Sequence, residues 1–159
     1  MEEALTEMIE LLGDRAYDSE IFRLNEPPFN RFPNTTWSEM ERDGLIERLR
    51  ALGPPLAKLT GDGWYRAMEM TSRIEDPEFK ERLSGLTAAI KDRVKGRATD
   101  AFVHTNDLAK AARVSKDFVF NTIENHVIDR VFGIQGAQWS HRGKTIRIPQ
   151  TFGLPPLDD

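Results

Sequence analysis

The sequence predicts a mainly helical protein in two domains, each of which carries a small β-hairpin. Apolar residues recur at intervals of three and four along much of the chain, which is typical of helices with one buried face. Two short alternating segments flank the turn residues Gly53-Pro54-Pro55 and Arg142-Gly143, which is typical of hairpins. A domain boundary is expected near Pro77, because proline disfavours helical geometry at the residue before it.

The 159-residue chain has a formal net charge of −4, but this charge is unevenly distributed. Residues 1–76 contain 9 Lys and Arg against 16 Asp and Glu, which gives −7. Residues 77–159 contain 13 against 10, which gives +3. The sequence therefore predicts an acidic domain over 1–76 and a basic domain over 77–159, and the asymmetry indicates an anionic partner for the second domain.

The composition excludes several kinds of site and location. The absence of cysteine excludes disulfides and thiolate metal ligands, and it agrees with a reducing compartment. The sequence has no apolar run of about 18 residues and no basic start followed by an apolar stretch, so we expect a cytoplasmic protein without a membrane span. The three histidines are scattered, and no phosphate loop or nucleophile motif occurs. No metal site, cofactor or enzymatic activity is expected.

The first domain is expected to begin with helices. Apolar spacing predicts a helix over Glu3–Leu12 and a short helix over Asp18–Leu24. Thr36 and Glu39 have the spacing of a capping box, in which the hydroxyl and the carboxylate bind free backbone N–H groups of the same helix end. They predict a further helix that ends at Gly44.

The next residues have the pattern of a hairpin followed by a helix. Strands are expected on both sides of Gly53-Pro54-Pro55, and Thr60 is placed to cap a helix over Asp62–Ile74. This order, with L-T-x-x-G at Leu59–Gly63, resembles the second half of winged-helix domains of the multiple-antibiotic-resistance repressor type. The helix before the hairpin is acidic, so we expect the first domain to serve packing or a protein partner. Its exposed positions are Ser38, Glu39, Glu41 and Asp43.

The second domain is expected to begin with an amphipathic helix over Phe79–Val94. A short helix over Asp107–Ala112 follows, capped by Thr105 or Asn106, whose side chains can accept from free helix N–H groups. A longer helix is expected from Lys116. Its apolar residues recur every four positions and form one buried stripe of Val119, Ile123, Val127 and Val131.

Beyond this helix the period of the sequence changes to two. Strands are expected over Gln138–His141 and Lys144–Ile148, joined across Arg142-Gly143. The isoleucines of the second strand share one face, and Arg147 lies on the other. The apolar face can therefore cover the helices while the cations remain in solvent.

The segment Leu108–Val119 has the spacing L-A-x-x-A-x-V-S-x-x-x-V. This spacing resembles the helix-turn-helix of lactose-repressor-type and winged-helix transcription factors, with Ala109 and Ala112 where the two helices approach closely. Ser115 is placed to cap the second helix. Arg113 stands where the family usually has glycine, because this position tends to be left-handed, and a left-handed arginine costs about 1 kcal/mol.

The resemblance implies tandem winged-helix-like domains in a protein that binds double-stranded DNA through its second domain, as a transcription regulator. Palindromic sites would require a homodimer. The alternative is a tandem winged-helix interaction module of the chromosome-segregation or replication type, which binds a protein partner through the acidic first half. The side chains expected to face bases are Lys116, Asp117, Asn121 and Asn125, and those expected to hold phosphates are Lys110, Arg113, Arg142, Lys144 and Arg147.

Overall fold

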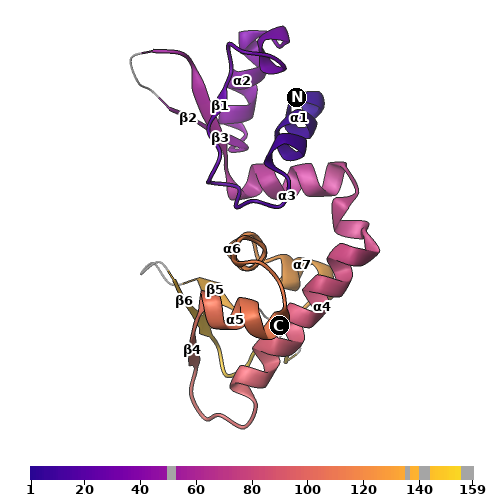
Figure 1. Cartoon of the computed structure of the whole chain (residues 1–159), viewed down its shortest axis with the longest axis vertical. Helices are drawn as coiled ribbons and strands as arrows, with labels where there is room; N and C mark the ends of the chain where they lie inside the picture. The colour runs from indigo at the N-terminus through magenta and orange to yellow at the C-terminus, as the bar shows by residue number, and fades with distance from the viewer. Residues whose placement is uncertain (50–52, 135–136, 140–143, 155–159) are drawn as a thin grey trace, which may run out of the picture. The chain divides into compact units, whose positions relative to one another are not determined.

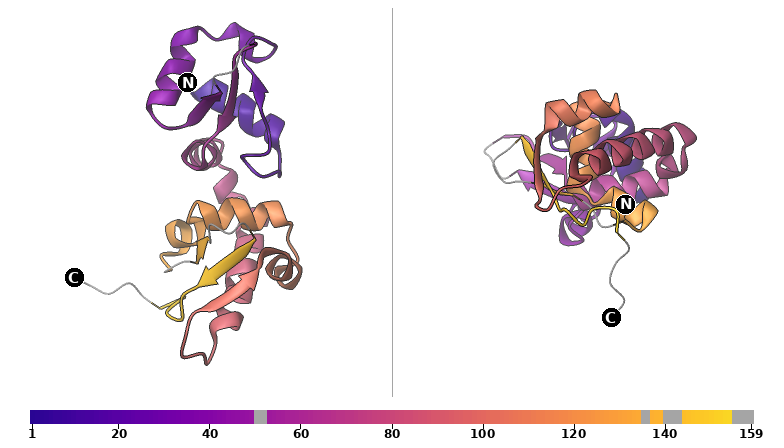
Figure 2. Two further views of the ribbon diagram at one scale, coloured as in Figure 1. Left: turned by 90° about the vertical axis from the view of Figure 1, so that its left-hand side faces the viewer. Right: turned by 90° about the horizontal axis from the view of Figure 1, so that it is seen from below.

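The structure is a computed structural model that describes residues 1–49, 53–134, 137–139 and 144–154. Its chain divides into two compact units, Met1–Asp76 and Pro77–Asp159 (Figure 1 and Figure 2). This division falls where the sequence changes from acidic to basic. The mainly helical fold with small hairpins that the sequence predicts is confirmed.

The first unit combines helices with a small antiparallel sheet. The strands lie in the order β1-β3-β2, and β3 is antiparallel to both of its neighbours. In chain order the elements are α1 (Glu2–Leu12), β1 (Phe22–Arg23), the 3-10 helix η1 (Phe29–Arg31), α2 (Asn34–Arg42), β2 (Ile46–Leu49), β3 (Leu56–Leu59), α3 (Gly61–Met70) and the 3-10 helix η2 (Arg73–Glu75).

The core of the first unit lies between α1 and α3 and under the sheet. Met8 and Ile9 of α1 are completely buried. A row of aromatic rings in edge contact then joins β1 to α2, with ring centroids 5.4 Å apart for Phe22 and Phe29 and 6.0 Å apart for Phe29 and Trp37. Such pairs contribute about 0.5–1.5 kcal/mol each beyond the area they bury, so the row helps to hold a strand of only two residues.

The start of α3 is hydrogen-bonded to the short segment between α2 and β2. The Thr60 hydroxyl accepts from the N–H of Gly63 (3.1 Å) and donates to the carbonyl of Gly44, and the Thr60 N–H donates to the carbonyl of Leu45 (3.1 Å). A Cβ on Gly63 would lie 1.9 Å from that Leu45 oxygen. Only glycine allows the two backbones to approach this closely, which explains the glycine of the L-T-x-x-G motif.

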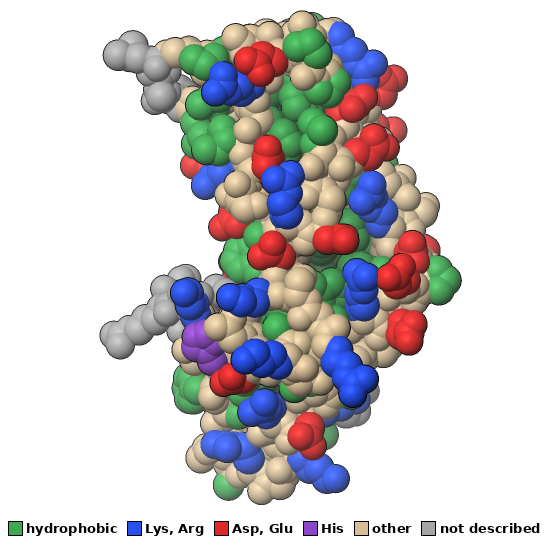
Figure 3. Space-filling model, viewed as in Figure 1, with side chains coloured by type: hydrophobic (Ala, Val, Ile, Leu, Met, Phe, Trp, Pro, Cys, Tyr) green, Lys and Arg blue, Asp and Glu red, His purple; other side chains and the backbone are tan. Residues whose placement is uncertain are grey.

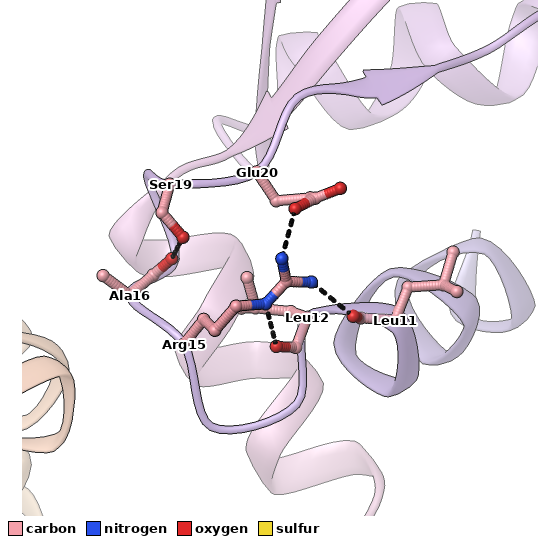
Figure 4. Close-up of polar contacts among 6 residues, drawn as sticks. All are labelled: Leu11, Leu12, Arg15, Ala16, Ser19 and Glu20. Carbon is pink, nitrogen blue, oxygen red and sulfur yellow. Dashed lines mark hydrogen bonds and ion pairs between the residues drawn. The ribbon is translucent and has the colours of Figure 1, made fainter. Parts of the chain in front are cut away.

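The connection from α1 to β1 is held by Arg15, whose guanidinium folds back onto the end of the helix (Figure 4). Its Nε donates to the carbonyl of Leu12 (3.0 Å) and its Nη2 donates to the carbonyl of Leu11 (2.7 Å). Its Nη1 also pairs with Glu20 (2.7 Å). The last carbonyls of a helix lack partners within the helix, and a cation there is favoured by the helix dipole, so Arg15 has a structural role.

The second unit also combines helices with a small antiparallel sheet. A helix leads into a strand, further helices follow, and a hairpin closes a three-stranded antiparallel sheet in the order β4-β6-β5. In both units the first strand pairs with the last. The elements are α4 (Pro77–Val94), β4 (Ala101–His104), α5 (Thr105–Ala112), α6 (Lys116–Glu124), α7 (Val127–Phe132), β5 (Gln138–Trp139) and β6 (Thr145–Ile148).

The core of the second unit is formed where α4 packs beside α5 and over β4 and β6 (Figure 1). Leu83, Leu86 and Ile90 of α4 are completely buried, and so are Ile146 and Ile148 of β6. The expectation that the isoleucines share the inner face of this strand is confirmed.

Several predicted elements of the first unit differ in the structure. The short helix expected over Asp18–Leu24 is absent, and its apolar residues lead into β1. The capping box at Thr36 is also wrong, because α2 begins two residues earlier at Asn34 and its N-cap is Pro33. The hairpin is confirmed, with Ile46 paired to Leu59, and so is the cap at Thr60.

Two predicted features of the second unit also need correction. The single helix expected from Lys116 is two helices, α6 and α7, with His126 in a left-handed conformation between them. Strand β4 was not expected, because four residues carry little periodic signal and their partners in β6 lie 41 to 47 residues away.

Candidate nucleic-acid interface

The first helix of the predicted helix-turn-helix, α5, is capped at both ends. His104, rather than Thr105 or Asn106, is its N-cap, and the His104 Nδ1 accepts from the N–H of Asn106 (3.1 Å). At the other end Arg113 has φ 57° and ψ 41°, and the N–H of Val114 donates to the carbonyl of Ala109 (3.0 Å). This is the left-handed helix end expected from the position that Arg113 occupies. The Arg113 side chain is exposed.

The second helix, α6, begins at the expected residue. The Ser115 hydroxyl accepts from the N–H of Phe118 (3.0 Å) and caps the helix, as the sequence predicts. Lys116 in the first turn is exposed and Asp117 is half-buried. Lys116 and Asp117 are therefore the two predicted base-facing side chains that remain accessible.

The other two predicted base-facing side chains are buried. Asn121 is 4% exposed and Asn125 is 6% exposed, and the Asn125 Nδ2 donates to the backbone carbonyl of Asn121 (2.8 Å). Val119 and Ile123 lie around the helix from these asparagines and are buried as well, so α6 is covered on both sides. The expectation that Asn121 and Asn125 meet DNA is corrected, because side chains this buried cannot reach a groove.

The break after α6 follows from its last residues. The Asn125 side-chain amide donates to the backbone carbonyl of Asn121 in the last turn of α6. This carbonyl therefore has a partner without a further turn of helix. His126 then has φ 53°, in the left-handed region where asparagine and histidine are enriched. The dipeptide Asn125-His126 was the sequence signal for this break.

The hairpin of β5 and β6 lies where the wing was expected, with Gln138 paired to Arg147 and Trp139 paired to Ile146. The hairpin is joined to α5 at Lys144, just before β6, because the Lys144 carbonyl accepts both from the Thr105 N–H (2.7 Å) and from the Thr105 hydroxyl (2.9 Å). The Lys144 side chain is exposed. This link places Lys144 at the start of α5.

Arg142, expected at the tip of the wing, lies outside the described residues. No statement about its position follows from the structure.

The Arg147 guanidinium is paired with the carboxylate of Asp100. Its Nη2 lies 2.6 Å and its Nε 2.8 Å from the Asp100 Oδ2, and the other Asp100 oxygen accepts from the N–H of Gln150 (3.1 Å). The Gln150 N–H, together with the Arg147 guanidinium, lowers the pKa of the Asp100 carboxyl. The pairing leaves Arg147 poorly placed to hold a phosphate, and the sequence carried no signal for a partner 47 residues away.

Three residues predicted to hold phosphates, Lys110, Arg113 and Lys144, are exposed, and their side chains are unpaired within the described part of the chain. The same is true of Lys116, which was predicted to face bases. We call this set the helix-turn-helix cations. Figure 3 shows that Lys and Arg side chains gather over the second unit. The helix-turn-helix cations are Lys110, Arg113, Lys116 and Lys144.

No cluster of metal-ligating side chains occurs in the residues that the structure describes. Those residues include no group of three or more His, Asp and Glu that could hold a metal ion. Over the same residues, no helix combines the length and apolar character needed to cross a membrane. Comparison of the chain with family models, curated proteins and solved structures found no match.

Proposed function

We propose that the second unit is a winged helix-turn-helix domain that binds double-stranded DNA, with α5 and α6 as the helix-turn-helix and the β5–β6 hairpin as the wing. The observation that carries this proposal is the set of helix-turn-helix cations, which are exposed and free of carboxylate partners among the described residues. The order of helices and strands, with β4 paired to β6, supports this proposal. A role as transcription regulator, on palindromic sites as a homodimer, is the expected use.

The accessible residues favour contacts with the DNA backbone over contacts with bases. Cations that neutralise phosphates bind all sequences alike, whereas base reading requires donors and acceptors in the groove. With Asn121 and Asn125 buried, the accessible base-facing groups are Lys116 and Asp117. We therefore expect salt-dependent binding with a modest sequence preference.

The second candidate function is a protein interaction module. It is favoured by the burial of Asn121, since α6 offers no continuous polar face, and by the net charge of −7 over residues 1–76. In this case the acidic first unit binds a protein partner. Duplex DNA is then not a ligand.

A salt titration of DNA binding separates the two functions. Four phosphate contacts predict a slope of log affinity against log salt of about −3.6, because each contact contributes about −0.9. Lys110→Ala/Lys116→Ala should flatten this slope by about 2 and weaken all sequences alike. Arg42→Ala/Arg66→Ala is the matched control, since it removes two exposed cations from the first unit. Wild-type protein that leaves duplex DNA free at low salt would replace the DNA-binding proposal by the interaction module.

A further inference from the structure

A second group of cations lines an open groove at the end of α4. The groove lies between the last turns of this helix and the turn that follows β6, and its volume is about 630 Å³. Lys91, Lys95 and Arg97 contribute its positive charge, and Asp92 is the one carboxylate in its described lining. We call it the α4 groove. It shares no residue with the helix-turn-helix cations.

The cations of the α4 groove have no partner within the part of the chain that the structure describes. Lys91, Lys95 and Arg97 are exposed, and no ion pair or hydrogen bond of their side chains occurs there. By contrast, Arg82 on the same helix pairs with Glu78 (2.7 Å). Three unpaired cations around one groove repel each other, and an anion that binds between them removes this repulsion.

The groove is partly preformed. Gly153 has φ 86°, and a Cβ there would lie 2.8 Å from the Lys91 Cε, so the aliphatic part of Lys91 lies across the backbone of this turn. Val94 and Phe152 below it are 6% and 5% exposed. A lysine whose stem is already packed loses less conformational freedom when its ammonium group binds.

The groove and α5 lie on different sides of α4. The carbonyl of Ala112 in α5 lies 3.7 Å from the position of a Cβ on Gly85, so Gly85 marks the side of α4 that faces α5. At about 100° per residue, Lys91 lies about 120° around the helix from Gly85, and Lys95 follows directly after the last residue of α4, Val94. Because the groove shares no residue with the helix-turn-helix cations, we expect a straight duplex bound to those cations to leave the groove open.

We propose that the α4 groove binds the phosphate backbone of a second nucleic-acid segment, so that one chain can hold two duplexes at once. The inference rests on the proposed DNA binding of the second unit. Phosphate is the matching group because the groove offers three exposed cations and a single carboxylate, and a regular backbone presents phosphates at short intervals to such a row.

The test is a capture experiment with the full chain and two short duplexes. The first duplex is biotinylated and held on beads, and the second carries a fluorophore and is too short to bend back on itself. At low salt, wild-type protein should remain on the beads and retain the second duplex. Lys91→Glu/Lys95→Glu should remain on the beads as wild type does, while retention of the fluorescent duplex falls to the level without protein.

Matched single variants separate the groove from general charge. Lys95→Glu and Arg93→Glu make the same change in net charge at the C-terminal end of α4, but Arg93 does not line the groove. We expect Lys95→Glu to reduce capture and Arg93→Glu to leave it near wild type. Equal thermal melts for all variants confirm that these exposed positions do not affect folding.

Three outcomes would overturn the inference. Wild-type protein that stays on the first duplex without capturing the second refutes the groove and leaves the proposed function intact. If Lys91→Glu/Lys95→Glu still captures the second duplex, the groove does not hold it, and two associated copies of the chain hold one duplex each. Wild-type protein that is not retained by the first duplex refutes both proposals.

Discussion

Replacing Gly63 by alanine should destabilise the first unit, although alanine is the better helix former. A Cβ at this position would lie 1.9 Å from the Leu45 carbonyl oxygen, about 1.5 Å closer than the ordinary contact distance of about 3.4 Å. The oxygen is backbone and accepts from the Thr60 N–H (3.1 Å), so no side-chain rotation can relieve the contact. Either α3 or the start of β2 must move.

The net effect can be estimated from two opposing terms. Overpacking a well-packed site costs about 1–3 kcal/mol and more where only backbone can move, whereas alanine favours a helix over glycine by about 1 kcal/mol. Because the clash is with backbone, we expect a loss of about 2 kcal/mol in the free energy of unfolding of the first unit. With a urea dependence of about 1–3 kcal/mol per molar, the midpoint should fall by about 1 M.

Gly85→Ala is the matched control in the second unit. Gly85 also lies within a helix, but a Cβ there would meet only the Ala112 oxygen at 3.7 Å, which is an ordinary contact. The substitution should therefore stabilise the second unit by about 0.5–1 kcal/mol. The two glycines thus predict shifts of opposite sign from the same chemical change.

Urea unfolding followed by tryptophan fluorescence and circular dichroism measures both shifts. Trp37 and Trp64 are each 3% exposed in the first unit, so in a Trp139→Phe background the fluorescence reports this unit alone. Circular dichroism reports the helices of both units. An unchanged fluorescence midpoint for Gly63→Ala, or a loss for Gly85→Ala as large as that expected for Gly63→Ala, would refute the reasoning from close backbone approach.

Two further substitutions test the candidate interface. Asp100→Asn should release Arg147 and steepen the salt dependence of DNA binding by about 1, as a titration against wild type would show. Because the pKa of Asp100 is lowered from its ordinary value of 3.8, the ionised carboxylate stabilises the fold fully above pH 3.8. This stabilisation is lost as the pH falls through the pKa of the folded state, so the melting temperatures of the variant and the wild type should converge below pH 3.8. Arg113→Gly should raise stability by about 1 kcal/mol, because φ is 57°, yet flatten the salt dependence by about 1. A gain in both stability and DNA affinity would exclude Arg113 from the interface.

Much of the fold could be predicted because the signals lie close together in the sequence. The hairpins were found from turn residues next to short alternating runs, and the cap at Ser115 was found from its place before an apolar stripe. Arg113 was expected to be left-handed, and φ is 57°. By contrast, β1 and β4 were missed because they are short and each becomes a strand only through a partner far along the chain.

The candidate site was less predictable for the same reason. Sequence shows that Arg147 is a cation on the outer face of a strand, but its availability depends on Asp100, which lies 47 residues earlier. Periodicity placed Asn121 opposite the apolar stripe of α6, yet a polar face can be buried when hydrogen bonds satisfy its groups. Here the Asn125 side-chain amide donates to the backbone carbonyl of Asn121, which satisfies the buried side chain of Asn125.

The link between Thr105 and Lys144 bears on how a surface of this kind would bind DNA. The Lys144 carbonyl accepts two hydrogen bonds from Thr105, so the hairpin at the start of β6 and the first turn of α5 form one frame. Lys144 and Lys110 are exposed on the two parts of this frame. Cations held at fixed separations match the regular spacing of backbone phosphates with little loss of freedom on binding. The same rigidity gives no preference among bases, so sequence selectivity would have to come from Lys116 and Asp117 at the start of α6 or from the deformability of the DNA.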